Sequence, residues 1–105
     1  MSIYGEWLAA TIAASGTDSS EVNLGKDFDF IEIQIPTMDA CTVKIQVAES
    51  SGGTFYNLGD AQTTTSGTHN YADVFKLGGY QFIKVIASAA QSSGAVAIRV
   101  RGMRF

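Results

Sequence analysis

Apolar and polar residues alternate strictly in two stretches of the chain between residues 28 and 48. Ile31, Ile33 and Ile35 share one side of an extended strand, while Glu32 and Gln34 share the other side. The same period of two returns after a short connection, in the segment 42–48. Strands with one buried and one wet face are typical of antiparallel sheets, whereas the strands of a parallel α/β sheet are buried on both faces.

Polar segments rich in glycine, serine and threonine divide the chain at a spacing of roughly a dozen residues, which is typical of all-β proteins. The predicted strands span residues 6–13, 20–24, 30–36, 42–48, 54–58, 69–77, 81–88 and 95–103. Segments 25–27 and 78–79 are predicted turns, and segment 62–70 is the longest predicted loop. A helical turn at residues 7–12 is an alternative to the first strand. The prediction is an all-β antiparallel β-sandwich of about eight strands, with residues 1–105 as a single domain.

The inward positions of the long strands define a predicted core. Its members are Ile31, Ile33, Ile35, Val43, Ile45, Val47, Ile83, Val85, Ala87, Val96, Ile98 and Val100. Five further residues are predicted to close the ends of this core: Trp7, Phe55, Leu58, Val74 and Leu77. A core of this size makes a small domain only marginally stable on its own, so contacts with a partner protein would add to its stability.

Charged residues form 16% of the chain, against roughly 25% in ordinary soluble domains. A lightly charged surface favours coverage by another protein, and we expect a homo-oligomer. The net charge of −3 argues against the uniformly basic footprint of a nucleic-acid binder. No window approaches the ~20 apolar residues of a membrane span, and the first residues lack the basic leader of a signal peptide.

Charge is unevenly distributed along the chain. The acids of the first 39 residues are Glu6, Asp18, Glu21, Asp27, Asp29, Glu32 and Asp39, and the bases after residue 74 are Lys76, Lys84, Arg99, Arg101 and Arg104. Either the first and last strands are neighbours that complement each other, or the basic C-terminal strand docks on an acidic partner.

Arg99 and Arg101 alternate with Val100 and are expected to project together from the outer face of the last strand. They could discourage edge pairing, form a protein interface, or contact phosphate, although the aromatic interleaving of a nucleic-acid platform is sparse there. The candidate protein-interface residues are Tyr4, Trp7, Arg99, Arg101, Arg104 and Phe105. Tyr56, Tyr71 and Tyr80 are either sugar-stacking residues or plugs of the core.

The sequence offers little for catalysis. Its one histidine, His69, and its one cysteine, Cys41, fall short of a catalytic triad or a zinc site, and Cys41 is predicted to be a small buried hydrophobe. Asp27 and Asp29 have a spacing that occurs in calcium loops, but it equally fits a solvated strand. We therefore predict no enzyme, and no catalytic, metal-binding or cofactor-binding residues.

Four segments together resemble small β-sandwich structural proteins of tailed bacteriophages. They are Val22-Asn23-Leu24-Gly25, Ile33-Gln34-Ile35-Pro36, the run from Ile45 to Leu58 through Gly52-Gly53, and Phe82-Ile83-Lys84-Val85-Ile86-Ala87-Ser88. The Gly-Gly turn before Thr54 departs from the acidic-Gly turn of that group. The resemblance implies a jelly-roll-like sandwich and a virion component assembled in the host cytoplasm. It further implies a capsid decoration (cement) protein, often trimeric, that binds the major capsid protein or another virion protein. A carbohydrate-binding module of a phage tail or fibre is the alternative.

Overall fold

The computed structural model describes residues 3–39, 41–58, 63–66, 70–92 and 94–104. These residues form an all-β structure in which no helix occurs. The strands are β1 (Ile3–Tyr4), β2 (Leu8–Ile12), β3 (Val22–Ile35), β4 (Cys41–Ala48), β5 (Tyr56–Asn57), β6 (Thr63–Ser66), β7 (Tyr71–Ala87) and β8 (Val96–Arg104). The predicted strand at residues 6–13 is confirmed as β2, and its helical alternative is wrong.

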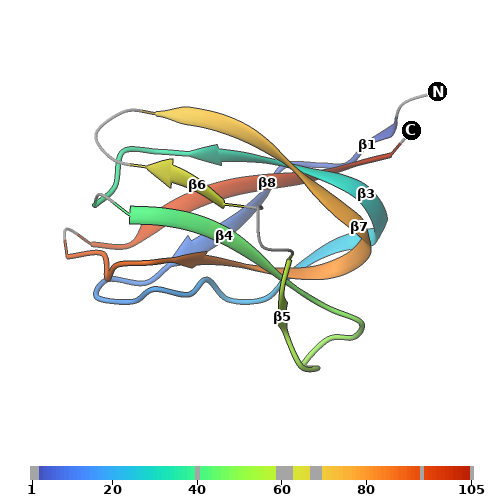
Figure 1. The fold of residues 1–105 in the computed structure, drawn as a ribbon, viewed down its shortest axis with the longest axis horizontal. Coiled ribbons are helices and arrows are strands. Elements are labelled where there is room, and N and C mark those ends of the chain that lie inside the picture. The colour runs from blue at the N-terminus through green and yellow to red at the C-terminus, as the bar shows by residue number, and fades with distance from the viewer. Residues whose placement is uncertain (1–2, 40, 59–62, 67–69, 93, 105) are drawn as a thin grey trace.

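Every strand pair is antiparallel, and the strands hydrogen-bond into one sheet with the order β1-β8-β3-β7-β4-β5. β2 also pairs with β8, and β6 also pairs with β4. The first and last strands are therefore neighbours, as one of the two charge-based interpretations expected (Figure 1).

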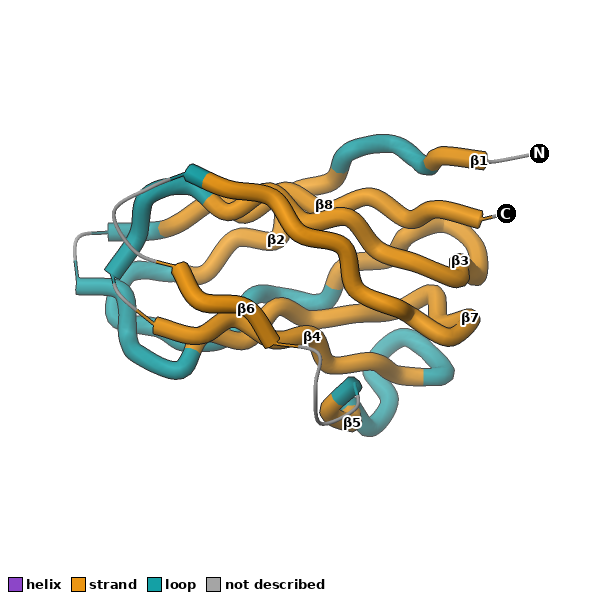
Figure 2. The backbone as a smooth tube through the Cα atoms, turned by 45° about the horizontal axis from the view of Figure 1, so that its top comes forward, coloured by secondary structure: helices purple, strands orange, loops and turns teal. Residues whose placement is uncertain are grey.

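β3 and β7 bend together and continue into both halves of the sheet (Figures 1 and 2). We call the part formed by β1, β2, β8, residues 30–35 of β3 and residues 71–76 of β7 the β8 half. The β4 half contains residues 22–23 of β3, residues 82–87 of β7, and the strands β4, β5 and β6. The inner faces of the two halves pack against each other, because one cluster of buried side chains draws on both.

The turns predicted at residues 25–27 and 78–79 are wrong. The chain runs through both segments as part of β3 and β7, so the strands predicted on either side of each segment are continuous. Gly25, Gly78 and Gly79 adopt positive φ angles of 92°, 80° and 92°, which glycine tolerates best. The β3–β7 register shifts in this region, so the glycines produce bulges that bend two paired strands instead of reversing the chain.

Strand formation at the edge of the β4 half also differs from the prediction. β6 lies inside the predicted loop 62–70, where β-branched threonines favour an extended chain and pair with Cys41 to Lys44 of β4. The strand predicted at 54–58 is reduced to Tyr56–Asn57, and β1 was not predicted. Residues 62 and 67–69 of the predicted loop, His69 among them, lie outside the described residues.

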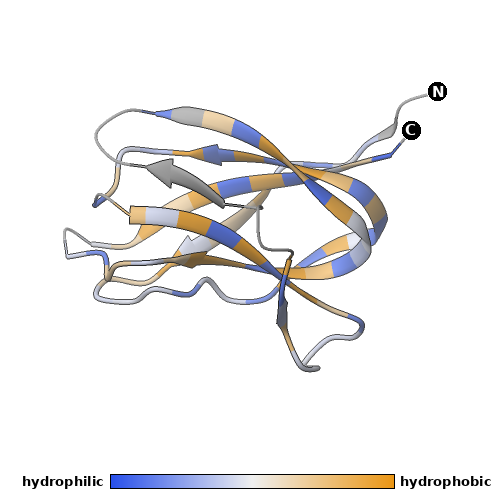
Figure 3. Cartoon of the chain, in the orientation of Figure 1, coloured by the Kyte–Doolittle hydropathy of each residue, from blue (hydrophilic) through white to orange (hydrophobic). Residues whose placement is uncertain are grey.

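The predicted core is largely confirmed. All its members are buried except Val96, which is partly buried against the cluster, and the alternation is visible along β3, β7 and β8 in Figure 3. Among the predicted end residues, Leu77 is fully buried, Leu58 packs on the core, and Phe55 and Trp7 are half-buried. Val74 is 48% exposed, so its prediction as a core residue is wrong: its register partner is Glu32, on the outer face.

Phe28, at the bend of β3, is the largest fully buried side chain. Its ring lies against Gly102 of β8, where an added Cβ would stand 2.1 Å from the ring atom Cδ2. Glycine is required at residue 102 because a bulky aromatic ring occupies the space that any side chain would need.

Residues 71–76 of β7 form an edge of the β8 half, since their only described strand partner is β3. Asp73 stands opposite Ile33 in the register, which places it on the inward side of this edge. Its carboxylate accepts a hydrogen bond from the backbone N–H of Val74 at 2.8 Å. An inward-pointing charge and a capped amide both oppose pairing with another strand.

Candidate functional site

The outer face of the β8 half is an open sheet surface with a regular arrangement of side chains. Arg101 of β8, Glu32 of β3 and Val74 of β7 are register partners and form one row across it. Arg99, Gln34 and Ala72 form the next row. Alternation along each strand turns these residues away from the buried face.

Arg101 is the centre of a cluster on this face. Its Nε donates a hydrogen bond to Oε1 of Glu32 at 2.8 Å, and each of these side chains is only about a quarter exposed, at 28% and 26%. The guanidinium carbon lies 4.8 Å from the ring centroid of Tyr4 and 4.6 Å from that of Trp7. These distances are typical of cation–π contacts, so one arginine links the N-terminal segment to β3.

Arg99 occupies a different environment from Arg101. Its guanidinium carbon lies 5.7 Å from the ring centroid of Trp7, and no acid among the described residues reaches salt-bridge distance from it. Arg99 is exposed. The face therefore presents one neutralised arginine and one arginine whose charge is uncompensated by any described acid.

The structure thus brings together four of the six candidate interface residues, namely Tyr4, Trp7, Arg99 and Arg101. Arg104 is exposed on β8, where it pairs in register with Ile3, and among the described residues no salt bridge or cation–π contact joins it to the cluster. Phe105 lies outside the described residues.

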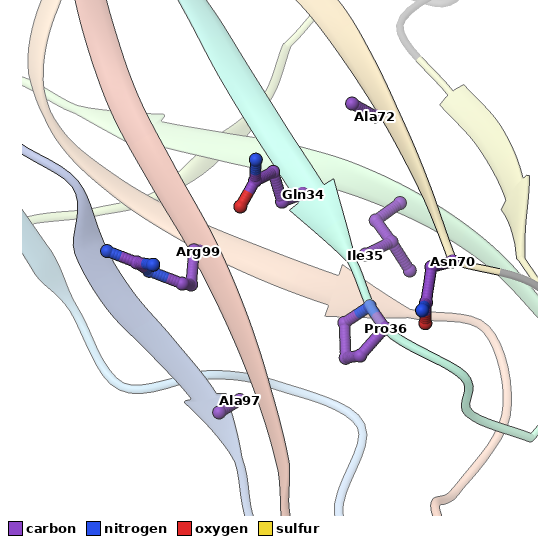
Figure 4. A pocket seen from close by; sticks show the side chains of 7 residues that line it. All are labelled: Gln34, Ile35, Pro36, Asn70, Ala72, Ala97 and Arg99. Atoms are coloured by element: carbon purple, nitrogen blue, oxygen red, sulfur yellow. The ribbon is translucent and has the colours of Figure 1, made fainter.

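A groove of about 460 Å³ opens at one end of the same face. It is lined by Gln34, Ile35, Pro36, Asn70, Ala72, Ala97 and Arg99 (Figure 4). Gln34 and Arg99 project from the neighbouring strands β3 and β8, while Pro36 and Asn70 lie close together beyond the end of β3. Asn70 is held there because its Oδ1 accepts a hydrogen bond from the backbone N–H of Thr37 at 3.0 Å.

The sequence analysis missed Glu32 as the partner of Arg101, and it missed the groove. The alternation of β3 already placed Glu32 and Gln34 on the outer face, but the pairing of β3 with β8 joins residues 69 positions apart in sequence. A period of two reveals which face a residue occupies, and it carries no information on which strand lies beside it.

The β4 half carries its own polar contacts. Glu21 accepts hydrogen bonds from the backbone N–H of Gly52 at 2.8 Å and from the hydroxyl of Ser51 at 2.6 Å. These two donors, in that order, with a smaller contribution from Lys84, lower the pKa of Glu21 below its ordinary value. Lys84 also lies 4.6 Å from the ring centroid of Phe55. These contacts of Glu21 and Lys84 therefore hold the loop between β4 and β5 against the outer side of the β4 half.

The remaining predicted residues lie apart from one another. Cys41 is buried, as predicted, and Nε2 of Gln91 approaches its sulfur at 3.9 Å. Tyr56 is 64% exposed, Tyr80 packs partly buried against the core, and the side chain of Tyr71 lies outside the described residues. Asp27 and Asp29 are exposed. Throughout the described part of the chain, His, Cys, Asp and Glu side chains form no group of three or more that could hold a metal ion.

No protein-family model matches the sequence, and no curated protein is significantly similar to it. Solved structures do share its fold. The SPBc2 prophage-derived protein YomS has a TM-score of 0.65 and 14% identity, over 98% of this chain and 95% of that chain. The family 29 carbohydrate-binding module CBM29_1 of Piromyces equi has a TM-score of 0.63 and 11% identity, over 99% and 91% of the two chains.

The coat protein of Tobacco streak virus is also similar, with a TM-score of 0.50 and 8% identity, over 99% of this chain and 86% of that chain. The structural neighbours thus include a prophage protein, a viral coat protein and a carbohydrate-binding module. At these identities the likeness establishes the fold. The described residues also contain no helix with the length and apolar character needed to cross a membrane.

Proposed function

We propose that this chain is a structural protein of a bacteriophage virion. More narrowly, we propose a capsid decoration protein with a jelly-roll-like sandwich fold. It binds the major capsid protein or another virion protein through the outer face of the β8 half, and it acts as a homo-oligomer, with a trimer favoured. The support is the likeness of fold to a prophage protein and to a viral coat protein, combined with the character of this face.

The observation that carries the proposal is the stacking of Arg101 on Tyr4 and Trp7. Tryptophan, tyrosine and arginine are the residues that contribute most of the binding energy in protein interfaces. A sugar ring needs an open aromatic face, but here guanidinium groups lie at cation–π distance from both rings. The cluster is therefore better suited to contacts with a protein than to stacking with a carbohydrate.

The surroundings of the cluster favour the same function. Small or apolar side chains accompany it on the exposed outer face: Ala9, Ala72, Val74 and Ala97. Arg101 and Glu32 neutralise each other at the centre. Protein interfaces have charge-depleted centres with aromatic residues and arginine enriched, and an assembled shell multiplies such contacts over many copies.

The test is reconstitution on virus particles. Particles of the source phage that lack the protein are incubated with the wild type, with Trp7→Ala and with Tyr56→Ala, and binding is measured by sedimentation. We expect Trp7→Ala to weaken binding by about tenfold or more. Tyr56→Ala is the matched control, because it removes an exposed aromatic ring from the other half of the sheet, and it should bind like the wild type. Equal binding by Trp7→Ala, or wild-type protein that does not bind particles at all, would refute the proposal.

A carbohydrate-binding module of a phage tail or fibre is the second candidate. It is favoured by the exposure of Tyr56 and by the likeness of fold to CBM29_1. Next to Tyr56, Oδ1 of Asn57 accepts a hydrogen bond from Nε2 of Gln46 at 3.2 Å, so amide groups stand near an open ring. A glycan array would support this function if a sugar bound the wild type and not Tyr56→Ala.

A further inference from the structure

We infer that the groove beside Arg99 receives the carboxylate of an aspartate or glutamate side chain of the partner protein. The inference rests on the proposed function and specifies the chemistry of the contact. It assigns the groove to an acidic segment of the partner that crosses the end of β3 and pairs with Arg99.

Arg99 and Arg101 of β8 differ in the groups that already contact their guanidinium groups. Arg101 already has a carboxylate at 2.8 Å and two aromatic rings. Arg99 has the more distant ring contact with Trp7, and the described acids leave its charge unpaired. A guanidinium presents a planar set of donors that matches the two oxygens of a carboxylate. Arg99 is thus an exposed arginine of this face whose guanidinium donors can bind an anion.

The lining of the groove favours a peptide as the carrier of that anion. Ala72, Ala97 and Pro36 form low walls beside the carboxamides of Gln34 and Asn70. Carboxamides pair with the polar backbone groups of a passing chain, and the small walls leave room for that chain. In Figure 4 Arg99 lies at one end of this arrangement and Asn70 at the other, so the groove recognises both a charge and a stretch of backbone.

A nucleic acid fits this groove less well than an acidic peptide. Phosphate backbones are bound by several cations that follow the strand, whereas the described residues that line the groove include a single cation, Arg99. Among the described residues, the ring at cation–π distance from Arg99 is that of Trp7, and Arg101 lies at cation–π distance from it as well. The described lining of the groove therefore offers neither the row of charges nor the open ring that a strand of nucleic acid requires.

The first test needs no partner. Amide chemical shifts of ¹⁵N-labelled protein are followed during titration with the capped peptide acetyl-Ala-Glu-Ala-amide, its neutral counterpart acetyl-Ala-Gln-Ala-amide, sodium glucuronate and inorganic phosphate. We expect the glutamate peptide alone to produce saturable shifts at Gln34, Ala72 and Ala97, and Arg99→Gln to abolish them. Lys26→Gln is the control, since it makes the same charge change at an exposed residue in the bend of β3.

Several results would overturn the inference: no shift with the glutamate peptide, equal shifts with the glutamine peptide, stronger saturation by glucuronate or phosphate, or unchanged binding by Arg99→Gln. The particle assay separates this inference from the proposed function. If the wild type binds particles and Arg99→Gln binds them equally, the carboxylate site is refuted while the virion role stands. If the wild type does not bind, the virion role itself fails. Confirmation is a loss of particle binding of about tenfold or more for Arg99→Gln, with Lys26→Gln unchanged.

Discussion

Replacing Gly102 with alanine tests the packing of β8 against the bend of β3. The new Cβ would lie 2.1, 2.2 and 2.6 Å from three ring atoms of Phe28, and contacts below 3.0 Å do not persist without movement. Phe28 is only 2% exposed, so its ring must be forced deeper into a filled core or displaced from it.

The sign of the effect follows from the structure. Glycine to alanine at a position with ordinary φ would stabilise the protein by about 0.4–1 kcal/mol through the unfolded chain. Overpacking a core costs about 1–3 kcal/mol, and losing a buried phenylalanine costs about 3–5 kcal/mol. We therefore expect Gly102→Ala to destabilise the protein by roughly 2–4 kcal/mol, which corresponds to a fall in Tm of at least about 8 °C.

A double-mutant cycle measured by urea denaturation isolates the clash. The free energy of unfolding is determined for the wild type, Gly102→Ala, Phe28→Ala and the double variant. Once Cγ and the ring of residue 28 are gone, the added methyl group of residue 102 has space, so the double variant should be no less stable than Phe28→Ala alone. A destabilisation below about 0.5 kcal/mol for Gly102→Ala, or the same cost in the Phe28→Ala background, would show that the ring does not explain the glycine.

Three further predictions concern other parts of the fold. The folded-state pKa of Glu21 lies below its ordinary value of 4.5. The contribution of Glu21 to stability is therefore present above pH 4.5 and is lost as the pH falls through the folded-state pKa. When the free energy of unfolding is measured by denaturation between pH 6 and 3, it should decrease less for Glu21→Gln than for the wild type. Asp73→Val removes the charge from the inward side of the β7 edge and should increase self-association in sedimentation velocity, whereas the exposed control Asp29→Val on β3 should not. The buried thiol of Cys41 should react with a thiol reagent at the rate of opening of the fold, so mild denaturant should accelerate the reaction and a rapid reaction in native buffer would contradict its burial.

The fold class and the core could be predicted because they depend on local alternation. Ile31, Ile33 and Ile35 are all buried in the structure, because a strand with a single apolar face must turn that face toward the core to remove it from water. Val74 shows the limit of this reasoning. It is apolar, yet the pairing of β7 with β3 places it opposite Glu32 on the open face, and pairing depends on residues distant in sequence.

The glycine segments could not be interpreted correctly from the sequence because glycine serves turns and bulges equally. Gly78 and Gly79 have the positive φ angles that a tight turn would also use, but β3 lies alongside and continues past them. The candidate site was partly predictable for a similar reason. Alternation placed Arg99 and Arg101 on one face, whereas the contacts with Tyr4 and Trp7 arise from the pairing of the first strands with the last.

The passage of β3 and β7 through both halves of the sheet has a kinetic consequence. Residues of β3 pair with residues of β7 that are remote in sequence, from Ile35 with Tyr71 to Val22 with Ile83, so long segments must close before either half is complete. Pairing of this kind slows folding relative to proteins dominated by local contacts. We expect the two halves to form in one concerted step limited by the meeting of these two strands, and the chain during that delay exposes the same apolar strands that later make its core.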